Sequence, residues 1–560
     1  MPFTIDDIEA PTPDPAAIAR EYEAIHASLD RATTPEGRLV AISAWDDLRR
    51  RIETWSSLVG LHFQQDTGNE EFRKAREYRD GIVPKLTELE VAVKRKLLEA
   101  PYREELERTF GKQAFALWEA DVMAFDPAIA PSLVAEAKLE ASYGELMAAA
   151  EVEFQGGKHN LSSIVKFRED PDRGVRHGAE MARWGWFAKN RPALDRIYGE
   201  LVALRHGMAR TLGFENYIGL GYKRMKRVDY GQADVERFRA EVREHLVPLA
   251  ADLRRRQAAA LGVEKLMFWD DVVHDPTGNP APQGDHDWMI ERAKEMFDGM
   301  GKDLGGFFRM MTEARLTDLK NRDRKAPGGF CTGFPVYGVP YIFANFNGTK
   351  HDVEVFTHEM GHAYQGYRSR RQPLIDYLWP TLESCEIHSM GLEFLAWPHM
   401  EKFFGGDAER FRRLHLAQAL LFIPYGVAVD HFQHLVYARP EASPAERHAM
   451  WQEMERTYLP WRDYGDLPHV SEGGFWQFQR HIYLSPFYYI DYTLAQTCAL
   501  QLWTRSQTDP AGTLATYEEL CERGGEAPFQ ELVRGAGLVS PFEPGCLQEV
   551  VATARKALGR

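Results

Sequence analysis

The chain has 560 residues, of which 44% are hydrophobic and 27% are charged, and its formal net charge at pH 7 is −15. That composition is typical of a soluble globular protein with enough apolar material for a sizeable core. Because binding to a phosphate backbone requires a basic surface, the acidic charge argues against nucleic-acid binding as the main activity.

The cysteines and the N-terminus favour a cytoplasmic protein. The five cysteines are an odd number and include no C-x-x-C pair, which is typical of a reducing compartment and predicts no thiolate metal site. The opening stretch, MPFTIDDIEAPTPDP, is acidic and Pro-rich and lacks the apolar core of a signal peptide. No segment approaches the roughly 18 apolar residues that a membrane span needs, so we expect no membrane association.

Helical periodicity dominates the chain from about residue 15 onward. In residues 194–213, Leu194, Ile197 and Leu201 fall on one face, and Gly213 ends the pattern. Similar amphipathic patterns predict helices at 36–63, 70–98, 102–120, 131–151, 176–190, 233–260 and 288–313. No fixed-period repeat is present, so the sequence predicts a mainly α fold and argues against a solenoid.

Two regions interrupt the helical pattern. Residues 267–287 are rich in Pro, Gly, Asn and Asp and are expected to form a loop. Residues 328–349, GGFCTGFPVYGVPYIFANFNGT, are rich in aromatic residues, and PYIFANF within them has strand character. We interpret this second region as a β-hairpin with its turn near residues 336–338. It forms one small sheet directly before the motif described next.

The stretch VEVFTHEMGHAYQGY contains His358, Glu359 and His362 in the order His-Glu-x-x-His. On a helix the two histidines lie one turn apart on one face, so both imidazoles can bind one Zn²⁺. Glu359 lies about 100° around the helix and can act as a base toward an attacking water. Five residues in this order also arise by chance in polar helices, so the motif alone does not decide between a metal site and a coincidence.

The residues around the motif support a helix and include one that could orient a metal ligand. Thr349 or Asp352 can cap the helix at its N-terminus. Glu354 lies one turn before His358 and could orient its ring by accepting a hydrogen bond.

A third metal ligand is expected in the downstream segment WPTLESCEIHSMGLEFLAW, which is helical by pattern. It contains Glu383, Glu386, His388 and Glu393. Three acids and a histidine are costly to bury in an apolar segment without a task. Glu383 and Glu386 share a helix face, so spacing does not say which one binds metal. Salt bridges to arginines are the alternative role for these residues.

The segment RHIYLSPFYYIDYTLAQ contains candidate oxyanion donors. The Ser-Pro pair at 485–486 predicts that a helix starts there. Tyr488 and Tyr492 would share a face of this helix, with Tyr489 adjacent and His481 just before it. Phenol and imidazole donors suit a tetrahedral oxyanion opposite zinc. Tyrosines at helical spacing are also common in protein cores, and that alternative stays open.

Together these segments resemble the M3 metallopeptidases, in particular the oligoendopeptidase F branch, whose relatives include thimet oligopeptidase and neurolysin. The resemblance rests on YIFANFNGTKHDVEVFTHEMGHAYQ, LESCEIHSMGLEFLAWP and HIYLSPFYYIDY, in that order. The upstream stretch LDRIYGELVALRHGMARTLGFENYIGLGY looks like the same branch. The resemblance covers about residues 190–500 well and the N-terminal third only in its helical character.

The resemblance implies a mainly α, neurolysin/zincin-like fold of two lobes flanking a deep channel, with one small β-sheet next to the His-Glu-x-x-His helix. It implies that residues 1–190 form a helical part of the channel wall and that residues 191–560 hold the catalytic region. It further implies one Zn²⁺ per chain and short oligopeptides as substrates, because a narrow channel excludes folded chains. The sequence does not indicate the oligomeric state.

The resemblance also implies a role for each candidate residue, and it selects Glu386 over Glu383. The metal ligands are His358, His362 and Glu386, the general base is Glu359, and the oxyanion donors are His481, Tyr492 and either Tyr488 or Tyr489. Substrate is expected to pair with an edge strand that includes Phe343, Ala344, Asn345 and Phe346, with Gly329 in a flexible turn nearby.

Three other functions fit parts of the sequence. A zinc carboxypeptidase on a related helical fold would need a cationic group that binds the C-terminal carboxylate of its substrate. A non-catalytic peptide-binding protein would have no need of Glu359, which is present. A helical scaffold with a coincidental motif would hold no metal. The predicted function is therefore a zinc-dependent endopeptidase that hydrolyses internal bonds of short peptides.

Overall fold

The computed structural model describes residues 3–326 and 328–559, and most of them are helical. The chain divides into two compact units, each assembled from three separate segments. Unit 1 comprises Met1–Phe125, Pro280–Glu409 and Cys498–Ser540, and unit 2 comprises Asp126–Asn279, Arg410–Thr497 and Pro541–Arg560. The assignment of separate roles to residues 1–190 and 191–560 stays a prediction.

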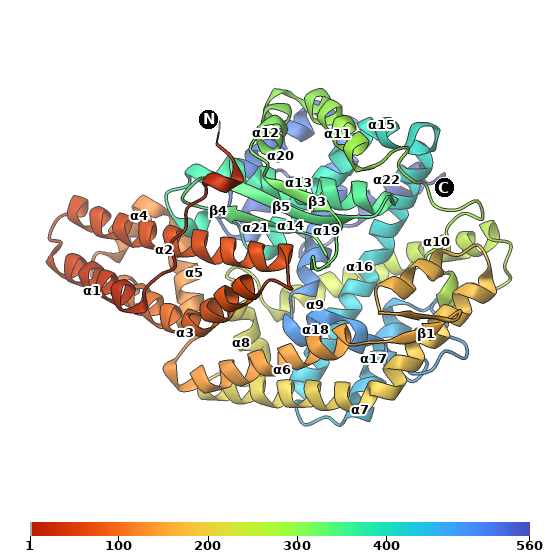
Figure 1. Ribbon diagram of the computed structural model, residues 1–560, viewed down its shortest axis with the longest axis horizontal. Coiled ribbons are helices and arrows are strands. Elements are labelled where there is room, and N and C mark those ends of the chain that lie inside the picture. Colours follow the sequence, from red (N-terminus) through yellow and green to blue (C-terminus); the bar gives the residue numbers. More distant parts are fainter. Residues whose placement is uncertain (1–2, 327, 560) are drawn as a thin grey trace. The chain divides into compact units, whose positions relative to one another are not determined.

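Unit 1 begins with a group of antiparallel helices (Figure 1). They are α1 (Pro15–Arg31), α2 (Pro35–Gln65), α3 (Glu70–Leu98), α4 (Arg103–Phe110) and α5 (Lys112–Met123). Their shared core is built around Trp45 and Trp118, whose ring centroids lie 5.3 Å apart. The predicted helix at 102–120 is split at Gly111, because the positive φ of 86° at this glycine ends α4 before α5 begins.

The sheet of unit 1 has three strands, β3 (Thr317–Lys320), β4 (Phe330–Phe334) and β5 (Val339–Phe346), in the order β3-β5-β4. The antiparallel pairing of β4 with β5 confirms the predicted hairpin (Figure 1). The prediction that β5 is an edge strand is wrong, because β3 pairs in parallel with its other side. The strand that lies at the edge next to the hairpin turn is β4.

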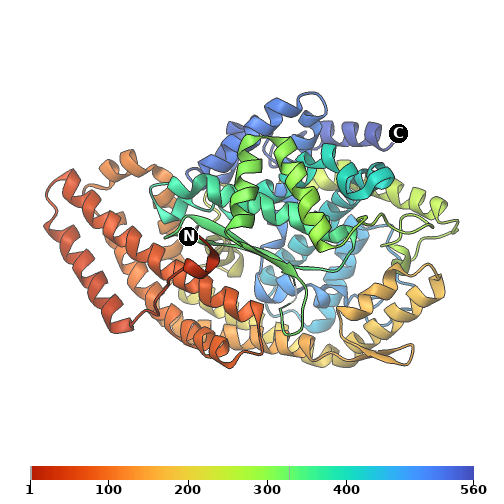
Figure 2. The ribbon, with the colours of Figure 1, turned by 45° about the horizontal axis from the view of Figure 1, so that its top comes forward.

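The remaining helices of unit 1 pack around this sheet and around one another. They are α11 (His286–Met300), α12 (Lys302–Glu313), α13 (Lys350–Arg368), α14 (Leu382–Leu395), α15 (Glu401–Phe404), α20 (Pro510–Arg523) and α21 (Phe529–Gly535). Helix α13 packs against β5, α14 and α20, and α11 and α12 lie side by side (Figure 2). The predicted helix at 288–313 is two helices, because the chain turns at Gly301.

Helix α13 begins after Thr349, but the side chain of Thr349 does not cap it. Asp352 holds the turn instead, since its carboxylate accepts hydrogen bonds from the backbone N–H groups of Asn347 and Gly348 at 2.6–3.0 Å. This turn connects the end of β5 directly to α13, so the sheet fixes where the metal-binding helix starts.

Unit 2 contains ten helices within its described residues and a short hairpin of β1 (Val152–Phe154) and β2 (Gly157–His159). The helices are α6 (Ala130–Ala148), α7 (Arg173–Thr211), α8 (Tyr217–Arg224), α9 (Gln232–Glu241), α10 (Val247–Ala260), α16 (Ala408–Ala438), α17 (Pro444–Tyr458), α18 (Arg480–Leu484), α19 (Tyr489–Ser506) and α22 (Gln548–Ala557), of which α16 and α19 share residues with both units.

The helices predicted at 176–190 and 194–213 are one helix, α7, which continues through Pro192. Proline removes one backbone hydrogen bond from a helix interior, and burial of the flanking Phe187 and Leu194 offsets that loss. Within residues 3–326 and 328–559, no helix is both long enough and apolar enough to cross a membrane.

Candidate metal centre

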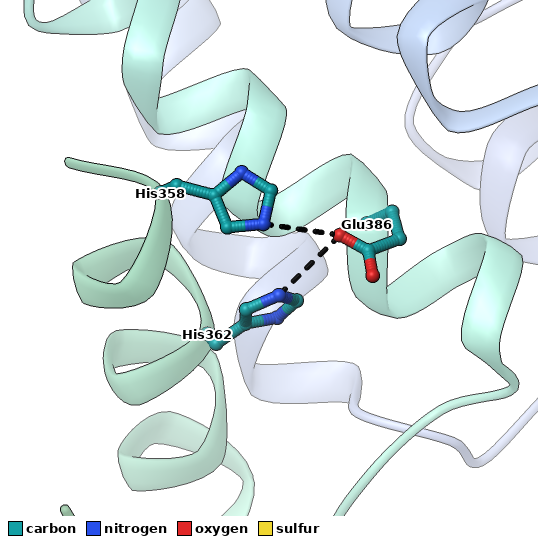
Figure 3. A group of neighbouring side chains, drawn as sticks. All are labelled: His358, His362 and Glu386. Atoms are coloured by element: carbon teal, nitrogen blue, oxygen red, sulfur yellow. Dashed lines mark ion pairs between the residues drawn. The ribbon is translucent and has the colours of Figure 1, made fainter. Parts of the chain in front are cut away.

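Helix α13 presents His358 and His362 on one face, as the spacing of the motif predicts. Their ring centroids lie 5.0 Å apart, and both rings point toward Glu386 of the neighbouring α14 (Figure 3). The Oε2 atom of Glu386 lies 3.3 Å from Nε2 of His358 and 3.4 Å from Nε2 of His362. Of the two glutamates that spacing could not separate, Glu386 joins the histidines in the ligand group.

The donor set fits a tetrahedral zinc ion. Metal bonds of 2.0–2.1 Å to nitrogen and oxygen place two ligand atoms of a tetrahedron about 3.3–3.4 Å apart. The two distances from Glu386 to the histidines match this edge length. Two imidazoles and one carboxylate are the ligands of catalytic zinc sites, which leave a fourth position open. The side chains therefore fit zinc both by type and by spacing.

Glycine inside the motif permits this approach of α14 to α13. A Cβ atom at Gly361 would lie 2.4 Å from the carbonyl oxygen of His388 and 2.6 Å from Cα of Ser389. Only glycine fits such a contact with backbone atoms. The sequence signal for Gly361 is its place in the interior of a predicted helix, where a glycine indicates close packing.

A further layer of contacts orients the ligands. The Nδ1 atom of His358 lies 2.7 Å from Oε1 of Glu393, which is about two turns along α14 from Glu386. The hydroxyl of Ser389 donates to Oε2 of Glu386 at 2.9 Å. The prediction that Glu354 orients His358 is wrong, since Glu354 pairs with Lys350 at 2.7 Å and both ring nitrogens of His358 face Glu386 and Glu393.

The carboxylates and imidazoles shift the pKa of one another. Burial alone would lower the pKa of His358, but the adjacent Glu386 and Glu393 raise it. Burial alone would raise the pKa of Glu386, but His362 and His358 hold it well below its usual range. Glu386 is therefore a carboxylate, which is the form that binds a cation.

Glu359 is buried beside the ligand group, with 6% of its surface exposed. Burial raises the pKa of its carboxyl, and the neighbouring His358 and His362 counter part of that effect. Its Oε2 atom has no hydrogen-bond partner within the described residues. A Cβ atom at Gly329 would lie 3.5 Å from Oε1 of Glu359. The exposed Gly329, just before β4, therefore lies next to the carboxyl group of Glu359. A raised pKa and an orphan oxygen suit a group that accepts and releases a proton.

The predicted oxyanion donors come together in unit 2. The ring centroid of His481 lies 5.7 Å from Tyr488, 5.1 Å from Tyr489 and 5.8 Å from Tyr492. The centroids of Tyr488 and Tyr492 lie 4.9 Å apart. All four side chains are half-buried rather than part of the core. Burial raises the pKa of Tyr489, so its phenol stays protonated and can donate.

The helix that carries these tyrosines starts later than the Ser-Pro pair predicts. Helix α19 begins at Tyr489, and His481 lies in the separate short helix α18. Phe487 between them has a φ of 68° and its N–H donates to Oε1 of Gln433 at 2.9 Å. The Arg227 guanidinium donates to the carbonyl oxygen of Phe487. Buried partners from other helices thus hold the backbone in a turn where local sequence favours a helix.

The four strand residues predicted to bind substrate are only in part accessible. Phe343 and Ala344 are fully buried, whereas Asn345 and Phe346 are half-buried. The side chain of Asn345 donates to the carbonyl oxygens of Ala326 and Gly328 at 2.9 and 2.8 Å, so it holds the chain that leads to Gly329. Phe343 pairs with both β3 and β4, whereas Phe346 pairs with β3 alone, so the binding of substrate at these residues stays a prediction.

Two imidazoles one helical turn apart, a carboxylate from a second helix and a buried glutamate between the histidines are the arrangement of His-Glu-x-x-His metallopeptidases. Comparison with known families agrees with this class. The Peptidase M3 N-terminal domain matches residues 5–125, and Peptidase family M3 matches residues 166–275 and 303–551. The chain therefore belongs to peptidase family M3.

Solved structures of this family are similar over the full length. A structure of PZ peptidase A with an inhibitor is 43% identical, with a TM-score of 0.94 and coverage of 99% of this chain and 98% of the other. A protein assigned as oligoendopeptidase F is 44% identical, with a TM-score of 0.95 and the same coverage. A protein with the same assignment from Bacillus anthracis str. Ames is 39% identical, with a TM-score of 0.90 and again the same coverage. Among curated proteins no match is found.

Proposed function

We propose that this M3 metallopeptidase is a zinc-dependent oligoendopeptidase that hydrolyses internal bonds of short peptides. The observation that carries the proposal is the position of Glu386 Oε2, 3.3 and 3.4 Å from the two histidine Nε2 atoms, with Glu359 buried next to them. The similarity to oligoendopeptidase F and PZ peptidase A over the full length supports peptide substrates. The five cysteines form no disulfide bond with one another, which supports a cytoplasmic location.

His358, His362 and Glu386 would hold the zinc ion, and Glu393 and Ser389 would keep two of these ligands in place. When bound, zinc supplies a Lewis acid that polarises a carbonyl and lowers the pKa of water. Glu359 takes the proton of the attacking water and passes it to the leaving amine. The raised pKa of Glu359 lies closer to neutral pH, where one carboxyl group can serve first as base and then as acid.

His481, Tyr492 and either Tyr488 or Tyr489 are proposed to donate hydrogen bonds to the oxyanion that forms when water attacks. Their clustering within unit 2 supports this role, since phenols and an imidazole share one half-buried patch there. Donors that are fixed before the reaction stabilise developing charge without a reorganisation cost.

For the substrate backbone we propose the outer edge of β4 rather than β5. The N–H of Ile342 donates to the carbonyl oxygen of Leu316, the residue just before β3, so it faces β3 and not β4. Backbone groups alternate sides along an antiparallel ladder, so Cys331, which pairs with Ile342, turns its N–H and C=O away from β5. The same holds two residues on at Gly333. This edge begins next to Gly329 and Glu359, which is where a peptide bond would have to lie to be cut.

The test is cleavage of a panel of internally quenched peptides of different lengths, with the fragments identified by mass spectrometry. Endopeptidase action predicts two fragments of several residues each from a short peptide and little cleavage of a folded protein. Release of single C-terminal amino acids would favour a carboxypeptidase instead. Failure to cut any peptide by a zinc-loaded protein would contradict the proposal.

A further inference from the structure

Unit 2 contains a cavity of about 250 Å³ whose walls combine aromatic rings with arginines. The four arginines are Arg168, Arg183, Arg254 and Arg462, and the aromatic residues are Phe268, Phe422, Tyr425, Phe475 and Phe478. A concentration of cations is notable in a chain whose formal net charge is −15. Every residue of this wall belongs to unit 2.

Arg462 is the least satisfied of these cations. Its side chain is 10% exposed, and its Nε and Nη1 atoms are buried without a hydrogen-bond partner in the described part of the chain. The nearest carboxylates, Glu455 and Asp271, lie 3.8 and 3.9 Å away, beyond hydrogen-bond distance. Its guanidinium carbon lies 4.9 Å from the ring centroid of Phe475 and 5.7 Å from that of Tyr425. The ring faces position the guanidinium, while the N–H groups at Nε and Nη1 have no acceptor among the described residues.

Arg183 and Arg254 are also incompletely paired. The side chain of Arg183 is 2% exposed and its Nη1 lies 3.5 Å from Glu180, while its Nε has no partner among the described residues. Arg254 donates to Gln257 Oε1 and to the carbonyl oxygen of Asp271, but its Nε is likewise buried and unpartnered there. Buried N–H groups of a charged side chain that lack acceptors are costly, which points to an acceptor that binds in the cavity.

The cations also repel one another. Burial and the neighbouring Arg168 lower the pKa of Arg183 to about 10. Burial lowers the pKa of Arg254, and Arg462 adds to this effect while Asp271 opposes it. Three carboxylates, Glu180, Asp271 and Glu455, face four guanidiniums. An anion in the cavity would balance the excess positive charge.

This cavity adjoins the group formed by His481 and the tyrosines Tyr488, Tyr489 and Tyr492. The hydroxyl of Tyr425 in the cavity wall donates to Oε1 of Gln479 at 2.6 Å, and Nε2 of Gln479 lies 2.7 Å from Nδ1 of His481. The ring centroids of Tyr425 and Phe422 lie 5.6 and 5.8 Å from that of Tyr489. A group bound in the cavity would therefore sit one layer of side chains from the proposed oxyanion donors.

We infer that the cavity is a subsite that binds a carboxylate of the peptide substrate, either the C-terminal carboxylate or an Asp or Glu side chain. The guanidinium fork matches a carboxylate in shape and offers two parallel N–H groups. The surrounding phenyl and phenol rings suit the apolar atoms of the same residue. The inference rests on the proposed function, because it takes the ligand to be a peptide.

The test uses four labelled peptides that differ only in two features, a C-terminal acid or amide and a Glu or Gln in the preceding residues. Binding is measured by fluorescence anisotropy on the full chain carrying Glu359→Gln, so that the peptides are not cut. We expect the acid or the Glu peptide to bind about tenfold tighter than its neutral partner, as for a hydrogen bond to a charged group. Whichever feature carries the preference identifies the source of the carboxylate.

Arginine variants locate the preference. Adding Arg462→Gln should remove the preference for the carboxylate peptide, while the affinity for the neutral peptide stays within about twofold of that of the Glu359→Gln chain. Arg462→Lys should retain part of the preference, because lysine keeps the charge but lacks the paired N–H groups of the guanidinium. Arg256→Gln is the matched control, since Arg256 lies on the same helix as Arg254 but is 53% exposed and pairs with Asp252. Thermal unfolding of each variant shows whether it is folded. If an arginine variant does not fold, the binding of the four peptides to the Glu359→Gln chain with all its arginines still tests the inference.

Equal binding of all four peptides would overturn the inference, as would a preference that survives Arg462→Gln in a folded chain. Cleavage by the wild-type protein is measured separately on the same peptides. Cleavage without any carboxylate preference would contradict the subsite and leave the proposed function standing. A carboxylate preference without cleavage would support the subsite and contradict the proposed function.

Discussion

Oε1 of Glu393 lies 2.7 Å from Nδ1 of His358, so α14 supplies both a ligand to the metal and the acceptor that orients another ligand. An acceptor at the second ring nitrogen fixes the tautomer and raises the basicity of a metal-binding histidine. We expect Glu393→Gln to weaken metal binding by about 10–100-fold, measured by competition with a chromophoric chelator.

Glu354→Gln is the control for that experiment, because Glu354 lies one turn before His358 on α13 but pairs with Lys350. Its metal affinity should stay within about twofold of the wild type, since no ligand contact changes. If Glu354→Gln weakened metal binding and Glu393→Gln did not, Glu393 would not be the residue that orients His358.

Gly361→Ala should damage the metal centre without touching a ligand. A Cβ at this position would meet backbone atoms of α14 at 2.4 and 2.6 Å, and backbone cannot move aside as a side-chain end can. Overpacking of this kind typically costs about 1–3 kcal/mol. We expect a lower unfolding temperature together with weaker metal binding, because Glu386 must shift with α14.

Gly207→Ala provides the comparison in a helix interior. Gly207 lies in α7 with no heavy atom within 4 Å of where its Cβ would be, so alanine should leave stability unchanged or raise it by up to about 1 kcal/mol. Equal unfolding temperatures for Gly361→Ala and Gly207→Ala would show that the close approach of α13 and α14 is not required.

Stability should fall with acid in part through His469. Burial, together with the nearby Arg191 and His448, lowers the pKa of this fully buried ring from 6.5 to about 4. The folded state therefore holds the neutral form, so its stabilisation is present above pH 6.5 and is lost as pH falls toward 4. The loss amounts to about 3 kcal/mol at most.

His469→Asn suits this measurement because His469 has a φ of 67°, a conformation that asparagine tolerates. We expect the unfolding temperature of the variant to decrease less than that of the wild type between pH 7 and pH 4.5. His351→Asn, at a histidine whose side chain is 70% exposed, should follow the wild type. Parallel curves for His469→Asn and the wild type would contradict the pKa assignment.

Replacement of the tyrosines by phenylalanine tests the oxyanion donors. Loss of one donor typically lowers kcat by about 10²–10³-fold, while KM changes much less because the bond is strongest in the transition state. We expect this result for Tyr492→Phe and for one of Tyr488→Phe and Tyr489→Phe. The variant with the larger loss identifies the first donor, and unchanged kcat in all three would exclude the tyrosines from the reaction.

Much of the helical structure and the ligand set could be predicted from the sequence. The i, i+4 spacing of His358 and His362 survives in the fold because α13 is a regular helix. Glycine and aromatic content similarly located the β4–β5 hairpin. These features are local, since each depends on residues within a few turns of one another.

What could not be predicted depends on partners distant in sequence. Strand β5 is internal because β3 pairs with it, and the short TDLK segment of β3 carries no clear strand pattern of its own. The acceptor for His358 is Glu393 rather than Glu354 because α14 packs across α13. Helix α19 starts late because Gln433 and Arg227 bind the backbone of Phe487. In each case a tertiary contact overrides a local preference.

The most direct test of the account compares wild type with Glu359→Gln in metal content and in cleavage of a quenched peptide. We expect one zinc per chain in both proteins, internal cleavage by the wild type, and a loss of cleavage by several orders of magnitude in the variant. Zinc in both proteins with equal cleavage would contradict the role of Glu359, and absence of bound zinc from both after loading would contradict the metal centre itself.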